Sequence, residues 1–306
     1  MLRPLYLKEN DAIALVAPAG KIDAGVIDNA VAQIRHWGFR AKVGDHATAS
    51  YAGFAGTDEQ RRSDLQAAID DPDTAAILCA RGGYGCSRII DTIDFSPLLT
   101  SPKWLVGFSD ITVLHARLQR IGLQSIHGAM PKTFPPAPGD DDSLRSLHEA
   151  LTGALTGYSI PPQPLNHAGK ARGILRGGNL SLLVNLAATP DDIVPNNTIL
   201  FMEDTDEHTY ALDRMMTNLH RSGKLRRVAG VVAGQFTMIK RDAIMPRQKD
   251  TCTLLSHYLK RLDVPVCYGF PAGHGEPNLS LYLGREAVLE VPDKDTANSP
   301  AQLYYV

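Results

Sequence analysis

The stretch WLVGFSDITVLHARLQRIG, residues 104–122, decides the fold class. It opens on a run of apolar or glycine residues, as does a strand buried on both faces of a parallel sheet. Apolar side chains then recur from Ile111 to Ile121 with the spacing of one helical face, and Gly122 ends the helix. A buried strand that leads directly into an amphipathic helix is the repeating unit of an α/β fold.

The same unit recurs upstream. Residues 12–17 and 75–79 are apolar runs that predict two further buried strands. A helix is expected over 24–37, and Thr57 with Gln60 forms the sequence pattern of a capping box at the start of another. This alternation of strands and helices predicts a parallel sheet with helices on both faces.

Prolines and acidic residues interrupt the alternation between about residues 132 and 168. Segments of this composition connect domains, because they favour turns over packed elements. We therefore expect an N-terminal α/β domain over residues 1–131, a connection over 132–168, and a C-terminal domain over 169–306.

The C-terminal part returns to the alternating pattern. Residues 199–202 form an apolar run that predicts a strand, and a helix is expected over 208–225. Near the end of the chain, apolar runs at 279–283 and 287–291 predict two antiparallel strands around a turn at Gly284. The whole chain is thus expected to be α/β.

The composition argues against two classes of partner. The 306-residue chain has a formal net charge of −2, so it carries no basic field that would hold nucleic acid. No apolar run approaches the roughly 18 residues of a membrane-spanning helix. Residues 13–19 are a short apolar stretch preceded by Glu9 and Asp11, which does not fit a signal peptide. We therefore expect a cytoplasmic protein that binds neither nucleic acid nor membrane.

The chain shows no metal-binding motif. Its four cysteines are Cys79, Cys86, Cys252 and Cys267. None forms a CxxC pair, and no HExxH motif or histidine-rich cluster is present. Scattered cysteines in a chain of this length indicate buried thiols in a reducing compartment.

Ser109 is the first candidate functional position. It follows the strand predicted over 104–108 and precedes a helix, where a side chain is lifted out of the sheet. The next backbone N–H, that of Asp110, points into the same space and can bind an oxyanion. The segment lacks the second glycine of a GxSxG motif. Ser109 is therefore either a nucleophile or a residue that caps the helix.

A glycine-rich turn, Arg81-Gly82-Gly83-Tyr84-Gly85, follows the strand predicted over 75–79. Glycines at such a place let the backbone approach a ligand closely. The turn suits an oxyanion hole, a phosphate site or a tight turn without a ligand. It is neither a Walker loop nor a GxGxxG motif.

A carboxylate and a histidine complete the candidates. Glu203 lies at the carboxyl end of the strand predicted over 199–202, where α/β sheets bind ligands. His274 lies between two glycines in a predicted loop, and His127 is a further candidate for lining a site. Ser109, Glu203 and His274 occur in an order found in acyl-transfer triads on α/β scaffolds.

Six short segments occur in order along nearly the whole chain. They are LVAPAG (15–20), ARGGYG (80–85), GFSD (107–110), GGNL (177–180), MED (202–204) and GH (273–274). As a set they resemble the L,D-carboxypeptidase family of serine peptidases. That family includes the muropeptide carboxypeptidases and the microcin-immunity peptidases.

The resemblance implies a catalytic triad of Ser109, His274 and Glu203. It implies an oxyanion hole formed by the backbone N–H groups of Asp110 and Gly83, with Gly82 as the adjacent alternative. It also implies a C-terminal domain built on a small β-structure, a homodimer, and no metal or organic cofactor.

The implied reaction is release of the terminal D-alanine from a murein tetrapeptide during peptidoglycan recycling. Arg81 or Asn179 is expected to recognise the free carboxylate of that D-alanine. One alternative is a microcin-immunity peptidase that cleaves a peptidyl-nucleotide, although no long aromatic insertion separates Glu203 from His274. The alternative of another class is a non-catalytic phosphate- or nucleotide-binding protein that uses the turn 81–85.

Overall fold

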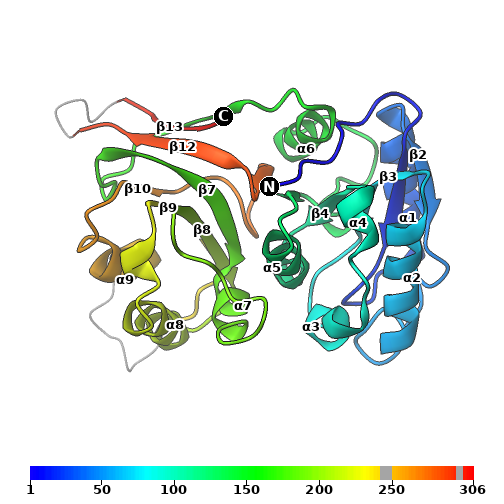
Figure 1. The fold of residues 1–306 in the computed structure, drawn as a ribbon, viewed down its shortest axis with the longest axis horizontal. Coiled ribbons are helices and arrows are strands. Elements are labelled where there is room, and N and C mark those ends of the chain that lie inside the picture. The colour runs from blue at the N-terminus through cyan, green and yellow to red at the C-terminus, as the bar shows by residue number, and fades with distance from the viewer. Residues whose placement is uncertain (242–249, 294–298) are drawn as a thin grey trace. The chain divides into compact units, whose positions relative to one another are not determined.

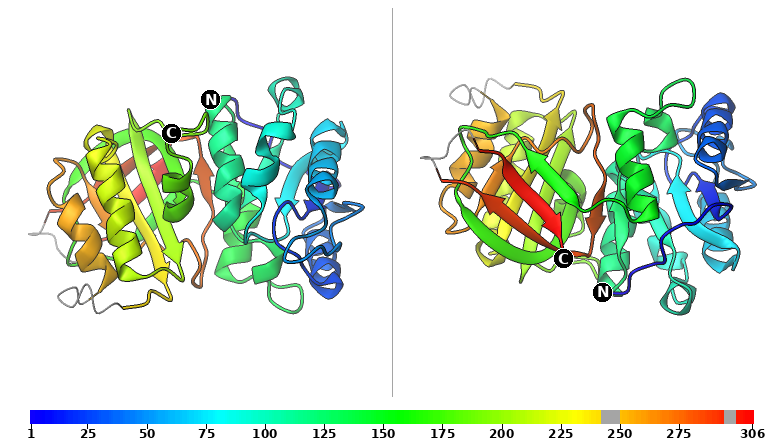
Figure 2. Two further views of the ribbon diagram at one scale, coloured as in Figure 1. Left: turned by 90° about the horizontal axis from the view of Figure 1, so that it is seen from below. Right: turned by 90° about the horizontal axis from the view of Figure 1, so that it is seen from above.

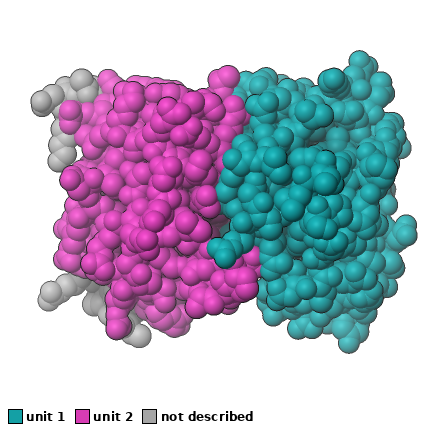
Figure 3. Space-filling view, viewed as in Figure 1, with its two compact units in different colours: residues 1–155, 277–283 teal, residues 156–276, 284–306 magenta. Residues whose placement is uncertain are grey.

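The computed structural model describes residues 1–241, 250–293 and 299–306. The chain forms two compact units, coloured separately in Figure 3. Unit 1 contains residues 1–155 and 277–283, and unit 2 contains residues 156–276 and 284–306.

Unit 1 is built on a six-stranded sheet with the order β11-β5-β4-β3-β1-β2. Figure 1 labels β2, β3 and β4 of this sheet. Its strands are β1 (Ala12–Val16), β2 (Arg40–Val43), β3 (Thr74–Cys79), β4 (Trp104–Gly107), β5 (Ser125–His127) and β11 (Leu281–Leu283). Its α-helices are α1 (Ala24–His36), α2 (Asp58–Asp70), α3 (Cys86–Ile89), α4 (Pro97–Thr100), α5 (Thr112–Arg120) and α6 (Asp142–Thr152). Strands β1 to β5 pair in parallel, and β11 pairs antiparallel with β5.

The strand and helix predicted from residues 104–122 are confirmed. Strand β4 is buried along its whole length and leads through a short 3-10 turn, Ser109–Ile111, into α5. The capping box of α2 is also present. The Thr57 hydroxyl accepts a hydrogen bond from the Gln60 N–H at 3.2 Å, and the Gln60 side chain accepts one from the Thr57 N–H at 2.9 Å. Such a cap contributes about 1 kcal/mol to helix stability.

The predicted hairpin around Gly284 is wrong. Strand β11 does not pair with β12 (Glu286–Val291). It pairs instead with β5 of unit 1, while β12 pairs with strands of unit 2. The physical reason is that every residue of β11 is buried, so the strand gains more by completing a core sheet than by forming a local hairpin.

Unit 2 is built on a seven-stranded mixed sheet with the order β10-β9-β8-β7-β12-β13-β6. Its other strands are β6 (Gly157–Ile160), β7 (Gly169–Asn179), β8 (Thr198–Thr205), β9 (Gly230–Thr237), β10 (Val266–Tyr268) and β13 (Ala301–Tyr305). Its α-helices are α7 (Leu180–Asn185), α8 (Thr209–Arg221) and α9 (Thr251–Leu259). Strands β7 to β10 pair in parallel and the remaining pairs are antiparallel. The α/β class is confirmed.

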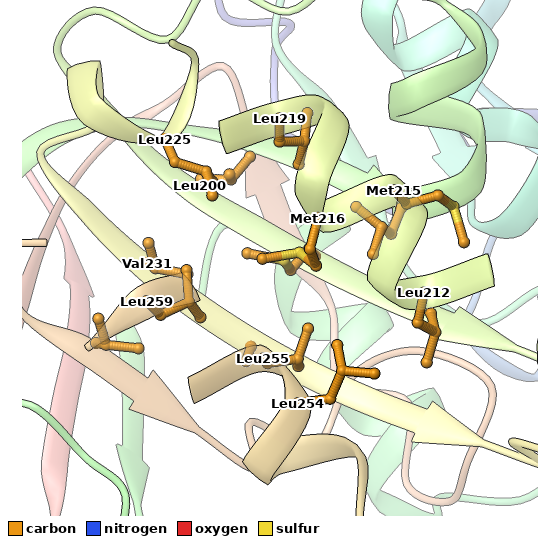
Figure 4. Packing of buried hydrophobic residues seen from close by; sticks show 14 of the residues in the cluster. Leu200, Leu212, Met215, Met216, Leu219, Leu225, Val231, Leu254, Leu255 and Leu259 are labelled. Atoms are coloured by element: carbon orange, nitrogen blue, oxygen red, sulfur yellow. The ribbon is translucent and has the colours of Figure 1, made fainter. Parts of the chain in front are cut away.

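One apolar cluster holds the helices of unit 2 against the parallel part of its sheet. Helices α8 and α9 lie together on one face of the sheet (Figure 2). Leu212, Met216 and Leu219 of α8 are buried with Leu254 and Leu255 of α9 (Figure 4). Burial of each such side chain contributes on the order of 1.5–3 kcal/mol. The cluster therefore fixes the parallel strands, at whose carboxyl ends Glu203 and Asn179 lie.

Candidate active site

Ser109 has an unusual backbone conformation. It follows β4 and Phe108, and its φ angle is +64°, in the left-handed region that non-glycine residues rarely adopt. The N-cap of the turn that begins here is Phe108, so the helix-cap interpretation of Ser109 is not supported. A strained serine between a strand and a helix has the geometry of a nucleophile elbow.

The glycine turn lies directly against Ser109. A Cβ atom added at Gly82 would lie 2.8 Å from the Ser109 Cβ, 3.0 Å from its Oγ and 3.2 Å from the Asp110 backbone nitrogen. Only glycine fits this space without a shift of the surrounding atoms. Gly83 follows with a φ angle of +106°, which turns the backbone after the contact. Unit 1 therefore brings together the predicted serine, Asp110 and the glycine turn.

Glu203 and His274 form a hydrogen-bonded pair in unit 2. The Nδ1 atom of His274 lies 2.6 Å from Oε2 of Glu203. Glu203 is fully buried on β8, whereas the side chain of His274 is 18% exposed. A buried carboxylate accepts hydrogen bonds, so Nδ1 carries the proton and the second ring nitrogen, Nε2, is the basic one.

Two glycines make room for Glu203. A Cβ at Gly273 would lie 2.9 Å from Oε2 of Glu203, and a Cβ at Gly234 would lie 3.3 Å from the Glu203 Cβ. The pairing register of β8 with β9 shifts between Met202 and Asp204, at the level of Glu203. Register irregularities of this kind re-aim a side chain next to a functional site.

Asp204, the next residue of β8, has a different role. Its carboxylate accepts hydrogen bonds from the Asn179 side chain and from the Ser181 backbone N–H, each at 2.9 Å. Burial raises the pKa of Asp204 from 3.8 to about 7, and the charge of Glu203 adds to this effect. The Asn179 oxygen also caps α7 by accepting the Leu182 N–H. The Asn179 side chain is thus engaged inside unit 2.

Arg81 and His127 both belong to unit 1 but differ in exposure. Arg81 is half-buried and donates a hydrogen bond from Nη1 to the Lys21 carbonyl at 2.8 Å. His127 is fully buried on β5, and its ring packs 5.8 Å from that of Phe108.

Sequence reasoning did not find the contact of Gly82 with Ser109, the glycines around Glu203 or the hydrogen bonds of Asp204. None of these has a sequence signal, because each depends on strands that meet in space. Over residues 1–241, 250–293 and 299–306, no group of three or more His, Cys, Asp or Glu side chains is placed to hold a metal ion. In the same part of the chain, no helix combines the length and apolar character needed to cross a membrane.

Two family models match most of the chain. A model described as the LD-carboxypeptidase N-terminal domain matches residues 13–128, and one described as the LD-carboxypeptidase C-terminal domain matches residues 172–289.

Curated relatives match along nearly the whole length. The probable murein peptide carboxypeptidase of Bacillus subtilis (strain 168) is 33% identical over 302 residues, covering 95% of this chain and 92% of the relative. The murein tetrapeptide carboxypeptidase of Pseudomonas aeruginosa is 35% identical over 289 residues, covering 91% of this chain and 92% of the relative.

Solved structures share the fold. Muramoyltetrapeptide carboxypeptidase from Oxalobacter formigenes is 29% identical with a TM-score of 0.84, covering 95% of this chain and 97% of that one. The microcin C7 self-immunity protein MccF, in complex with aspartyl sulfamoyl adenosine, has a TM-score of 0.85 at 20% identity. The match covers 100% of this chain and 99% of the MccF chain. At 20% identity it shows a shared fold only.

Proposed function

Because the chain belongs to the LD-carboxypeptidase family, we propose that it is a serine hydrolase that removes the terminal D-alanine from murein tetrapeptides. The substrate class is supported by curated relatives at 33% and 35% identity whose names specify murein peptides. The observation that carries the chemistry is the 2.6 Å hydrogen bond between His274 Nδ1 and Glu203, which leaves Nε2 as a base.

In the proposed mechanism, Ser109 Oγ attacks the carbonyl carbon that precedes D-alanine, and His274 Nε2 takes the hydroxyl proton. Glu203 holds the imidazole in the required tautomer and stabilises its charged form. His274 then gives the proton to the amine of D-alanine as the C–N bond breaks. Water, activated by the same histidine, hydrolyses the acyl-enzyme and releases the tripeptide.

The oxyanion is proposed to bind the backbone N–H groups of Asp110 and of Gly83, with Gly82 as the neighbouring alternative. The close approach of Gly82 to Ser109 and to the Asp110 nitrogen supports this assignment. Loss of one such donor typically lowers kcat by about 10²–10³-fold.

Arg81 is the proposed partner of the D-alanine carboxylate. It is the first residue of the glycine turn. Within the part of the chain that the structure describes, its half-buried side chain is bonded only through Nη1 to the Lys21 carbonyl, whereas the buried Asn179 side chain is bonded to Asp204 and caps α7. Arg81→Ala is expected to raise KM by about tenfold or more, the loss of a charge-assisted pair. An unaltered KM in a peptide titration would remove Arg81 from this role.

The decisive experiment follows free D-alanine after the purified protein is mixed with a murein tetrapeptide. We expect release by the native protein and none by Ser109→Ala. Release by both proteins would reject Ser109 as the nucleophile. If neither protein releases D-alanine, a peptidyl-nucleotide of the microcin type is the next substrate, and phosphate binding by both proteins would favour the non-catalytic alternative.

We further propose, from the family resemblance, that the protein is a cytoplasmic homodimer that acts in peptidoglycan recycling. Sedimentation velocity tests the dimer, and a monomer at assay concentration would reject it.

A further inference from the structure

We infer that the side chains of Asp110 and Arg61 are positioning residues that hold the glycine turn against Ser109. The inference rests on the proposed function, in which backbone N–H groups of Asp110 and of the turn bind the oxyanion. Neither side chain is expected to touch the substrate.

Asp110 is bonded through its side chain to the far end of the turn. It follows Ser109 directly, yet only 1% of its surface is exposed. Its Oδ2 atom accepts a hydrogen bond from the backbone N–H of Cys86 at 2.8 Å. Cys86 is the first residue of α3 and comes immediately after the turn 81–85. One residue therefore links the nucleophile to the end of the turn.

Arg61 is bonded to the same end of the turn. It lies on α2, is 1% exposed, and donates from Nη1 to the Gly85 carbonyl at 3.0 Å and to the Pro18 carbonyl at 2.6 Å. A Cβ at Gly85 would lie 2.6 Å from this nitrogen. Arg61 therefore fixes the carbonyl of Gly85 while Asp110 fixes the next N–H along the chain.

The near end of the turn is fixed by backbone contacts. The Gly20 N–H donates to the Gly82 carbonyl at 3.0 Å, and Gly82 lies against Ser109. Hydrogen bonds thus hold the turn at Gly82 and at Gly85, and a third holds Cys86 directly after it. The bonds at Gly85 and Cys86 come from buried ionisable side chains.

Burial of a carboxylate is unfavourable unless hydrogen bonds and an opposite charge compensate it. Burial raises the pKa of Asp110, while the Cys86 N–H and the charge of Arg61 act in the opposite direction. Ionisable groups with a pKa shifted by burial and by a specific charge are common at functional sites, and Asp110 directly follows Ser109.

The function of this arrangement follows from the geometry of oxyanion holes. Their donors must lie about 2.7–3.1 Å from the developing charge, and a displacement of about 1 Å lowers rates by about 10²-fold. A turn with three glycines does not keep such a position by itself, because glycine restricts the backbone least. The buried side chains of Asp110 and Arg61 restrict the backbone of the turn instead.

The experiment compares kcat and KM for D-alanine release among folded variants, with thermal unfolding measured on each. Asp110→Ala is expected to lower kcat by about 10²-fold with KM within about threefold of the native value. Asp110→Asn keeps an oxygen that accepts the Cys86 N–H, and it is expected to restore kcat to within about tenfold of the native value. Arg61→Met is expected to lower kcat like Asp110→Ala.

The matched control is Asp64→Ala. Asp64 is also a buried aspartate of unit 1 that accepts a backbone N–H, that of His46 at 2.8 Å, but it holds a different loop. We expect its loss to lower stability and to leave kcat unchanged. If Asp110→Ala does not fold, Asp110→Ser replaces it, because its shorter side chain keeps a polar group that does not reach Cys86.

The outcomes separate the two proposals. Full activity of Ser109→Ala would reject Ser109 as the nucleophile, and no release of D-alanine by the native protein would reject the proposed function. An inactive Ser109→Ala together with an Asp110→Ala, or Asp110→Ser, as active as Asp64→Ala would overturn the positioning role alone. A kcat for Asp110→Asn as low as that for Asp110→Ala would also overturn it, because the hydrogen bond would then not be the cause.

Discussion

The candidate site is defined by single residues that have little free space around them. Ser109 has a positive φ angle, and a Cβ added at Gly82 or Gly273 would come within 3.0 Å of Ser109 or Glu203. These contacts leave little freedom in the side chains that would react. The residue types of the triad were predicted from short motifs, whereas the contacts around them were not, because a motif records neighbours in the chain and not in space.

The contact of Gly82 with Ser109 leads to a prediction at this scale. Gly82→Ala is expected to lower kcat by about 10²-fold or more, because the added methyl group must displace Ser109 or the turn. Kinetics of D-alanine release measure the effect.

Gly25→Ala is the matched control for that variant. Gly25 lies in α1 with no atom within 4 Å of an added Cβ, so the change is expected to leave activity intact. It is also expected to stabilise the helix by up to about 1 kcal/mol. Equal activity of Gly82→Ala and Gly25→Ala would contradict the tight contact at Ser109.

At the scale of elements, the carboxyl ends of β7 and β8 lie side by side, with Asn179 paired to Glu203. Asp204 joins the end of β8 to the start of α7 through its bonds to Asn179 and to the Ser181 N–H. The sequence indicated that Glu203 was the carboxylate of interest. It did not distinguish the role of Asp204. Adjacent side chains of a strand point to opposite faces of the sheet, and only the neighbouring elements show what each side chain contacts.

Asp204 predicts a pH dependence of stability. Its folded-state pKa of about 7 lies above the unperturbed 3.8, so the folded protein binds this proton more tightly than the unfolded chain does. The stability contributed by the protonated form is complete below about pH 4 and is lost as the pH rises to about 7. The asparagine of Asp204→Asn cannot ionise, so this loss of stability with rising pH is expected to be absent in the variant.

Urea unfolding of the native protein and of Asp204→Asn at about pH 5 and about pH 8 measures the effect. Between about pH 5 and about pH 8, the native protein is expected to lose on the order of 1 kcal/mol or more of unfolding free energy relative to the variant. A difference between the two proteins that is independent of pH would show that Asp204 does not titrate in this range.

At the scale of the whole molecule, the sheet of unit 1 is completed by a strand from far along the chain. Strand β11 pairs with β5 and carries Tyr282, which is fully buried. The Tyr282 ring lies 5.4 Å from that of Trp104, and its hydroxyl donates to the Ala150 carbonyl at 2.7 Å. Residues 277–283 therefore belong to unit 1, although the residues before and after them in the chain belong to unit 2.

Tyr282 tests this arrangement. Tyr282→Ala is expected to lower the free energy of unfolding of unit 1 by about 3–5 kcal/mol through the cavity that it leaves. Tyr282→Phe removes only the hydroxyl and is expected to lower it by about 1 kcal/mol. Both tryptophans of the chain, Trp37 and Trp104, lie in unit 1, so urea unfolding followed by tryptophan fluorescence reports on this unit. Equal losses in the two variants would mean that β11 contributes little to the core.

The sequence by itself determined the α/β class, the buried strands such as β4, the capped start of α2 and the residue types of the candidate triad. These depend on local patterns: apolar runs, helical spacing and short motifs around Ser109, Glu203 and His274. Only the tertiary structure decided that β11 joins the sheet of unit 1 and that Asp110 and Arg61 anchor the glycine turn. The physical reason is that strand partners and buried charge pairs form between residues distant in the chain, where their stability depends on packing that no local pattern records.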